Sequence, residues 1–266
     1  MAAHVHPLIP VAGPAQSIRG LAMCAILIAC TLALLPFAQI HLGLLPAFFP
    51  VYQTAVLGAC LLTSYLLFGH FRATRLIPLL YLAAGYFYTA CVLVMQFLSF
   101  KGLSFSGEPL LGGPQSAIWL WFFWHLAPAT TILLATAKSF ETCSRESVSR
   151  SVVQTGGWLL ACVAGTAIVV FGFAHELPVM DVDGDFSRIT QSGLAPALEL
   201  LLAWALAGLW RASRFRNVLH IWLAVVLVAL LCDNAITMVA GSRNTLGWYA
   251  GRMGALVAFS VLAVVY

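Results

Sequence analysis

Charged residues are scarce in this chain, where Asp, Glu, Lys and Arg together make up only 8% of 266 residues. A soluble domain usually carries roughly 25% charged residues. Hydrophobic residues make up 62%, which excludes a soluble domain and is typical of a polytopic membrane protein. The few basic residues form no stripe interleaved with aromatic residues, so we expect no nucleic acid partner.

Motifs for catalysis and metal binding are also missing. The sequence contains no P-loop, GxGxxG, HExxH or GxSxG motif. Its seven cysteines form no CxxC pair, and their odd number argues against a disulfide framework or a zinc site. We therefore expect no catalytic residue, no metal and no cofactor in this chain.

Long apolar runs are abundant instead, and each is bounded by proline, glycine or charge. A span needs about 20 apolar residues, and backbone groups in lipid must be satisfied internally, which predicts helices. We expect an all-α bundle of eight transmembrane helices that forms one domain over residues 1–266, with a loose tail at 1–17. The predicted spans are 21–37, 50–69, 76–97, 115–137, 152–173, 190–210, 217–240 and 246–266.

The basic residues divide unequally between the two sides of these spans. With the N-terminus in the cytoplasm, nine lie on the inner side, three on the outer side, and Arg252 lies within the membrane. Inner loops carry an excess of Lys and Arg in membrane proteins. The pattern therefore predicts that both termini are cytoplasmic.

The stretch 231–254 carries Asp233, Asn234 and Arg252 between two apolar runs. Ionisable groups in a hydrocarbon layer are costly, so they usually pair or mark a site. If the two helices meet in a loop near 242–245, a rise of about 1.5 Å per residue places Asp233 and Arg252 each roughly 10 Å below it. The spacing predicts that they are partners across a helical hairpin.

Other polar and aromatic side chains share this depth in the outer half of the membrane. They predict a ligand pocket that opens outward and is lined by Gln53, Trp119, Trp124, His125, Glu199, Asp233, Asn234, Trp248, Tyr249 and Arg252. The alternative is that they only hold the helices together, with Arg252 neutralising Asp233 and Glu199. The formal charges of these three residues sum to −1, which leaves room for a cationic or proton-linked ligand.

Three smaller features leave alternatives open. His125 is either a hydrogen-bonded structural residue or a ligand or pH-sensing group, and no second histidine matches its depth for haem. Gly247 and Gly251 form a G-x-x-x-G pattern that suits packing within the chain or dimerisation. The run DVDGD at 181–185 predicts a solvated acidic loop, with calcium binding as an alternative despite a misplaced glycine.

Four segments together resemble a known family of sensors. They are FPVYQTAVLGACLLTSYLLFGHFR at 49–72, LAAGYFYTA at 82–90, LLGGPQSAIWLWFFWH at 110–125 and the pattern R-x-T-L-G-W-Y-x-x-R at 243–252. Their order and spacing are similar to the membrane-associated sensor (MASE) domains of the fourth type. The chain departs from that family where Met95 and Gln96 replace a Pro-His pair and where His70 replaces a glutamine.

The resemblance implies a sensory module of the bacterial inner membrane. Such modules usually precede a cytoplasmic output domain, often a GGDEF diguanylate cyclase that makes cyclic di-GMP and sometimes a histidine kinase. We therefore expect an output domain after residue 266 of a longer protein, and a homodimer because such cyclases generally work as dimers. Expected partners are membrane lipids and a small molecule, ion or lipid ligand. A proton-coupled transporter and a haem-binding membrane protein are the alternatives.

Overall fold

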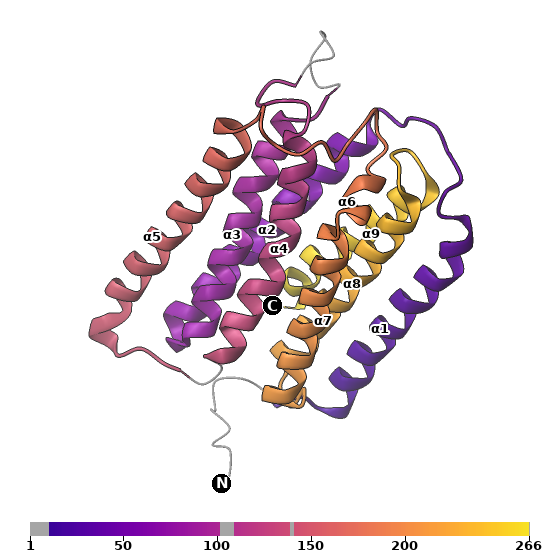
Figure 1. The fold of residues 1–266 in the computed structure, drawn as a ribbon. Coiled ribbons are helices and arrows are strands. Elements are labelled where there is room, and N and C mark those ends of the chain that lie inside the picture. Colours follow the sequence, from indigo (N-terminus) through magenta and orange to yellow (C-terminus); the bar gives the residue numbers. More distant parts are fainter. Residues whose placement is uncertain (1–10, 102–108, 139–140, 266) are drawn as a thin grey trace.

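The computed structural model describes residues 11–101, 109–138 and 141–265, and its fold is all-α (Figure 1). Within these ranges, eight helices are long and apolar enough to cross a membrane, as predicted. The helices are α1 (Pro14–Leu34), α2 (Phe48–Thr74), α3 (Ile77–Leu98), α4 (Ser116–Ala137), α5 (Val148–Ala167), a short α6 (Ser187–Gln191), α7 (Leu194–Ser213), α8 (Val218–Ala240) and α9 (Leu246–Val265). Short turns η1 (Leu35–Phe37), η2 (Arg145–Ser147) and η3 (Ile168–Gly172) extend α1 and α5.

The core of the bundle is built around α8, most of which is buried. This helix packs against α9, α1 and α7, while α2 packs against α3 and α9, and α3 packs against α4. Figure 1 shows α5 and α1 at opposite edges of the bundle, where few of their side chains are buried. Trp158 on α5 is 75% exposed, as expected for a side chain that faces lipid.

Three predicted helix starts differ from the structure by four residues or more, and one of them is the fifth, which lies at Val148 rather than 152. The first helix begins at Pro14, so residues 14–17 are helical rather than part of the predicted tail, whose residues 1–10 lie outside the described ranges. Proline suits a first helical position because its φ is preset and no N–H is needed there. The sixth predicted span starts at Leu194 rather than 190, because Gly193 interrupts the chain in a left-handed conformation (φ 85°).

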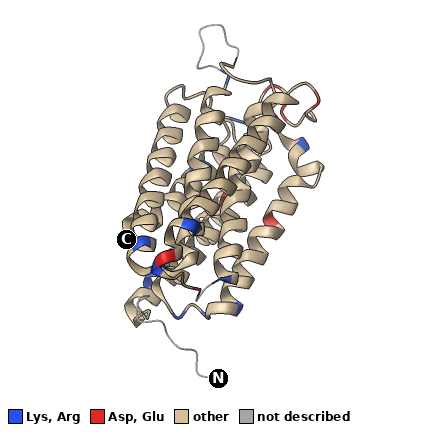
Figure 2. Cartoon of the chain, turned by 90° about the vertical axis from the view of Figure 1, so that its left-hand side faces the viewer, with Lys and Arg blue, Asp and Glu red and all other residues tan. Residues whose placement is uncertain are grey.

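Most basic residues lie at one end of the bundle, as Figure 2 shows. We call this the basic end; it is where α2, α4 and α7 finish and where α1, α3, α5 and α8 begin. Its residues are Arg19, Arg72, Arg75, Lys138, Arg145, Arg150, Arg211, Arg214 and Arg216. The prediction that both termini are cytoplasmic depends on this distribution of basic residues. The orientation of the bundle in the membrane stays a prediction.

Candidate functional site

The hairpin formed by α8 and α9 turns where the sequence predicts, at the end opposite the basic end. Helix α8 ends because Gly241 adopts a left-handed conformation (φ 64°), which glycine tolerates. Helix α9 begins after Thr245, whose hydroxyl oxygen accepts a hydrogen bond from the Trp248 N–H at 3.3 Å. The turn therefore sets Asp233 and Arg252 at matching depth on neighbouring helices.

Asp233 is the centre of a buried polar cluster. Its Oδ1 lies 3.5 Å from Nη1 of Arg252, which confirms the predicted pair. Its Oδ2 lies 2.9 Å from Nε2 of His125 on α4, and the Thr237 hydroxyl donates to Oδ1 at 3.2 Å. Asp233 is 1% exposed and His125 is fully buried, so the cluster connects three helices without contact with solvent.

His125 faces an acceptor at each of its ring nitrogens. Its Nδ1 lies 2.8 Å from the Trp121 carbonyl oxygen, and its Nε2 lies 2.9 Å from Oδ2 of Asp233. A neutral imidazole donates through one nitrogen only, so the tautomer decides which of these contacts is a hydrogen bond. Both contacts fix the orientation of the ring between α4 and α8.

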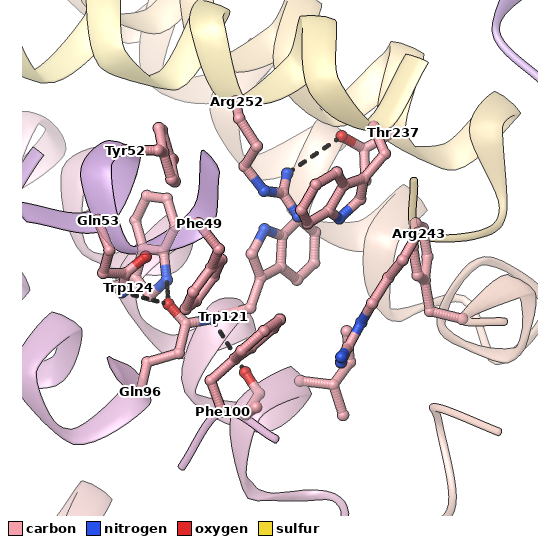
Figure 3. A pocket seen from close by; sticks show the side chains of 14 residues that line it. Phe49, Tyr52, Gln53, Gln96, Phe100, Trp121, Trp124, Thr237, Arg243 and Arg252 are labelled. Carbon is pink, nitrogen blue, oxygen red and sulfur yellow. Dashed lines mark hydrogen bonds between the residues drawn. The ribbon is translucent and has the colours of Figure 1, made fainter. Parts of the chain in front are cut away.

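A small cavity of about 30 Å³ lies beside Arg252 (Figure 3). This volume is enough for one or two water molecules. Figure 3 shows Arg252 extending from α9 toward Trp121, and its guanidinium carbon lies 5.9 Å from that ring and 5.2 Å from the ring of Trp248. The other lining residues are Phe49, Tyr52, Gln53, Gln96, Phe100, Ala117, Ile118, Trp124, Phe186, Thr237 and Arg243.

A glutamine pair fixes one wall of this cavity. Gln96 on α3 accepts hydrogen bonds from the Gln53 amide and from the Trp124 indole, both at 2.9 Å. The amide of Gln96 in turn donates to the Ala117 carbonyl at 3.0 Å. Because α2, α3 and α4 each contribute to this network, the wall is held by three helices.

Four of the ten predicted residues line the cavity directly, namely Gln53, Trp124, Trp248 and Arg252. His125 and Asp233 lie behind Arg252 in the polar cluster. Asn234 donates to Glu199 at 2.7 Å and to the Ala195 carbonyl at 3.1 Å, so it joins α8 to α7. Whether any of these residues binds a ligand stays a prediction.

Glu199, Trp119 and Tyr249 share the predicted depth but point elsewhere. The carboxylate of Glu199 is bound by Asn234 rather than by Arg252. The Trp119 indole donates to the Pro178 carbonyl at 3.1 Å, and the Tyr249 hydroxyl donates to the Gly43 carbonyl at 2.8 Å. Glu199 does not line the cavity, so its charge does not add to the predicted sum of −1 there, and the cationic or proton-linked ligand stays a prediction.

Tyr52, Gln96, Trp121 and Thr237 line the cavity although they were not predicted from the sequence as site residues. Helical spacing was a usable signal for two of them. Trp121 precedes Trp124 and His125 by three and four residues, and Thr237 follows Asp233 by four, so each pair shares a helix face. The other two depend on how α2 and α3 are rotated, which spacing alone does not reveal.

Residues 43–266 match the family MASE4, described as membrane-associated sensor, integral membrane domain. The chain belongs to this family. The matched part begins before α2 and contains every residue of the polar cluster and of the cavity. No curated protein and no solved structure matches the chain.

A wider cleft of about 730 Å³ lies next to the cavity of this MASE4 domain, on the side away from the basic end. We call it the vestibule; it shares Phe49, Phe100, Ala117, Arg243 and Trp248 with the cavity as lining residues. The rings of Phe49 and Phe100 stack with centroids 3.7 Å apart. These shared residues separate the two spaces and place the cavity directly beneath the vestibule.

The acidic loop at 181–185 lies beside the vestibule. It was predicted to be solvated, but one of its acids is paired with a basic side chain. Asp181 forms an ion pair with Arg243 and accepts a hydrogen bond from the Gly184 N–H at 2.9 Å. Burial lowers the pKa of Arg243, although Asp181 opposes this shift. Asp185 remains exposed, and the Ser187 N–H that it binds lowers its pKa. Among the described residues no group of three acidic, His or Cys side chains is placed to hold a metal ion.

The G-x-x-x-G pattern of this MASE4 domain serves packing between α8 and α9. A Cβ at Gly251 would lie 2.5 Å from Asp233 Oδ1 and 2.6 Å from Thr237 Oγ1, while one at Gly254 meets nothing nearer than 3.5 Å. We expect Gly251→Ala to lower the free energy of unfolding by about 1–3 kcal/mol through overpacking. Gly254→Ala is the matched control and should change it by less than about 0.5 kcal/mol. Unfolding in detergent measures both, and equal values for the two variants would contradict this account.

Proposed function

We propose that this MASE4 domain is a ligand-sensing input module of the bacterial inner membrane, with both termini in the cytoplasm. In this proposal it regulates a cytoplasmic effector that follows residue 266, a diguanylate cyclase in cyclic di-GMP signalling that works as a homodimer. The membership in a family of membrane sensors supports the sensory role. The observation that carries the ligand site is the buried cluster of Asp233, Arg252 and His125 beside a cavity.

The position of Arg252 suggests how a ligand would act. Its contacts with Asp233 and with the Thr237 hydroxyl are both long, at 3.5 Å, so a ligand with stronger acceptors can compete for the guanidinium. Arg252 lies on α9, which runs from the vestibule to Val265 at its far end. A ligand that binds one position of α9 better than another shifts the equilibrium between the two. That shift would reach an effector through the end of α9.

Both nitrogens of His125 are engaged by Trp121 and Asp233. Neither is free to hold an iron atom, so the residues present do not fit the haem alternative.

We expect Arg252→Gln in the full-length protein to change cyclic di-GMP output by roughly 5-fold or more, because it removes the charge that couples ligand to α9. Met253→Leu, on the exposed side of the same helix, is the control and should keep wild-type output. Output is measured in cells whose other cyclases have been deleted, with the amount of each variant in the membrane determined alongside. Wild-type output from correctly inserted Arg252→Gln protein would refute the proposal, and solute uptake into vesicles without any effect on output would favour a transporter.

A further inference from the structure

The cavity beside Arg252 contains polar atoms that the protein does not satisfy. Among the described residues, the Trp121 indole nitrogen, the Tyr52 hydroxyl and the Gln53 carbonyl oxygen are buried without a hydrogen-bond partner. All three residues line this cavity, and none is more than 3% exposed. Buried polar groups are nearly always hydrogen-bonded in folded proteins. Three unsatisfied groups around one cavity therefore indicate a bound molecule.

The kinds of groups present indicate the charge of that molecule. The Trp121 indole nitrogen can only donate a hydrogen bond, and the Tyr52 hydroxyl is able to donate one. The guanidinium group of Arg252 contains only donors and no acceptor atom. Arg243 and Arg252 both line the cavity, and no acidic residue is among the described residues that line it. Donors and positive charge together favour an anion.

We propose that the cavity binds a small planar oxyanion, of the class of formate and bicarbonate. Its oxygens accept hydrogen bonds from Arg252, Trp121 and Tyr52, because charge-assisted bonds from guanidinium groups to planar oxyanions are strong and directional. The Gln53 oxygen accepts a hydrogen bond from a hydroxyl of the ligand, which bicarbonate carries. A volume of about 30 Å³ and walls formed by Phe49, Trp124 and Trp248 restrict the ligand to a few non-hydrogen atoms.

The vestibule is lined by acidic and basic residues alike, and the basic residue nearest to the cavity is Arg243. Arg243 lines both the vestibule and the cavity and lies with its guanidinium carbon 5.0 Å from the ring of Phe100. An anion in the vestibule therefore meets Arg243 before Arg252. The stacked rings of Phe49 and Phe100 line both the vestibule and the cavity.

The test uses the purified full chain in lipid nanodiscs and measures binding of sodium formate and sodium bicarbonate by calorimetry at constant ionic strength. We expect both to bind, and we expect Trp121→Phe and Tyr52→Phe each to raise the dissociation constant at least tenfold. The matched controls are Trp222→Phe and Tyr86→Phe, whose polar atoms are also buried and unsatisfied but do not line the cavity. These controls should leave the dissociation constant within twofold of the wild-type value.

Three results would overturn the inference: no binding of either oxyanion, equal binding of sodium chloride, or unchanged affinity in folded Trp121→Phe and Tyr52→Phe. The inference concerns the ligand of the proposed sensor site and so rests on the proposed function, but the two fail separately. If Arg252→Gln changes effector output and no oxyanion binds, only the ligand class is wrong. If oxyanions bind as expected and output never changes, the sensory role is wrong and the binding site stands.

Discussion

Replacing Asp233 with alanine is expected to lower the free energy of unfolding by about 3–5 kcal/mol. The carboxyl group is the shared partner of Arg252, His125 and Thr237. Without it, the buried guanidinium keeps no anionic partner among the described residues, only the 3.5 Å contact with the Thr237 hydroxyl and its contacts with the Trp121 and Trp248 rings. An uncompensated buried charge is far more costly than a lost surface contact, which explains the size of the effect.

Denaturation of the purified protein with SDS in mixed micelles measures this change. Glu176→Ala is the matched control, because this exposed acid lies in the loop between α5 and α6 and should change the free energy by less than about 0.5 kcal/mol. An Asp233→Ala protein as stable as the Glu176→Ala protein would show that the cluster does not hold the helices together.

The second large effect is expected for Trp124→Ala, which should lower the free energy of unfolding by about 3–5 kcal/mol. Trp124 is 1% exposed, and its ring centroid lies 3.7 Å from that of His125 and 5.4 Å from that of Phe259. Its removal leaves a hole between α4 and α9 and takes one donor from Gln96. The surrounding helices can collapse only partly into that space.

Trp158→Ala supplies the comparison, since this tryptophan projects from α5 at the edge of the bundle. We expect a change of less than about 0.5 kcal/mol for it in the same SDS titration. If both tryptophan variants lose similar stability, the loss reflects tryptophan in a membrane generally and the packing account of Trp124 is incorrect.

The sequence was sufficient for the helices and for depth along them. Apolar runs must become helices in lipid because the backbone has no other partner there, and a constant rise per residue relates position to depth. These two facts predicted the eight spans and the meeting of Asp233 with Arg252 across the α8–α9 turn.

Rotation of each helix about its axis could not be obtained in the same way. Glu199 and Tyr249 lie at suitable depth, yet they bind Asn234 and the Gly43 carbonyl instead of lining the cavity. The contact between His125 and Asp233 depends on how α4 is turned toward α8, which the packing of side chains from several helices decides. This contact joins α4 to the Asp233–Arg252 pair, a connection that depth along the helices does not reveal.

The unequal burial of the helices was also hidden in the sequence. The runs that form α1 and α8 are similarly apolar, yet α1 lies at the edge and α8 in the core. In lipid an apolar surface has no need to be buried, so hydropathy alone does not separate a peripheral helix from a central one.

The most direct test of the account is a double-mutant cycle between Asp233 and Arg252, because everything proposed for the site depends on their contact. It compares the free energies of unfolding of Asp233→Ala, Arg252→Met and the double variant with that of the wild-type protein in SDS titrations. We expect the double variant to be more stable than the sum of the single effects predicts, with a coupling energy of about 1–3 kcal/mol. Additivity within about 0.5 kcal/mol would mean that the two residues do not interact and would contradict the account.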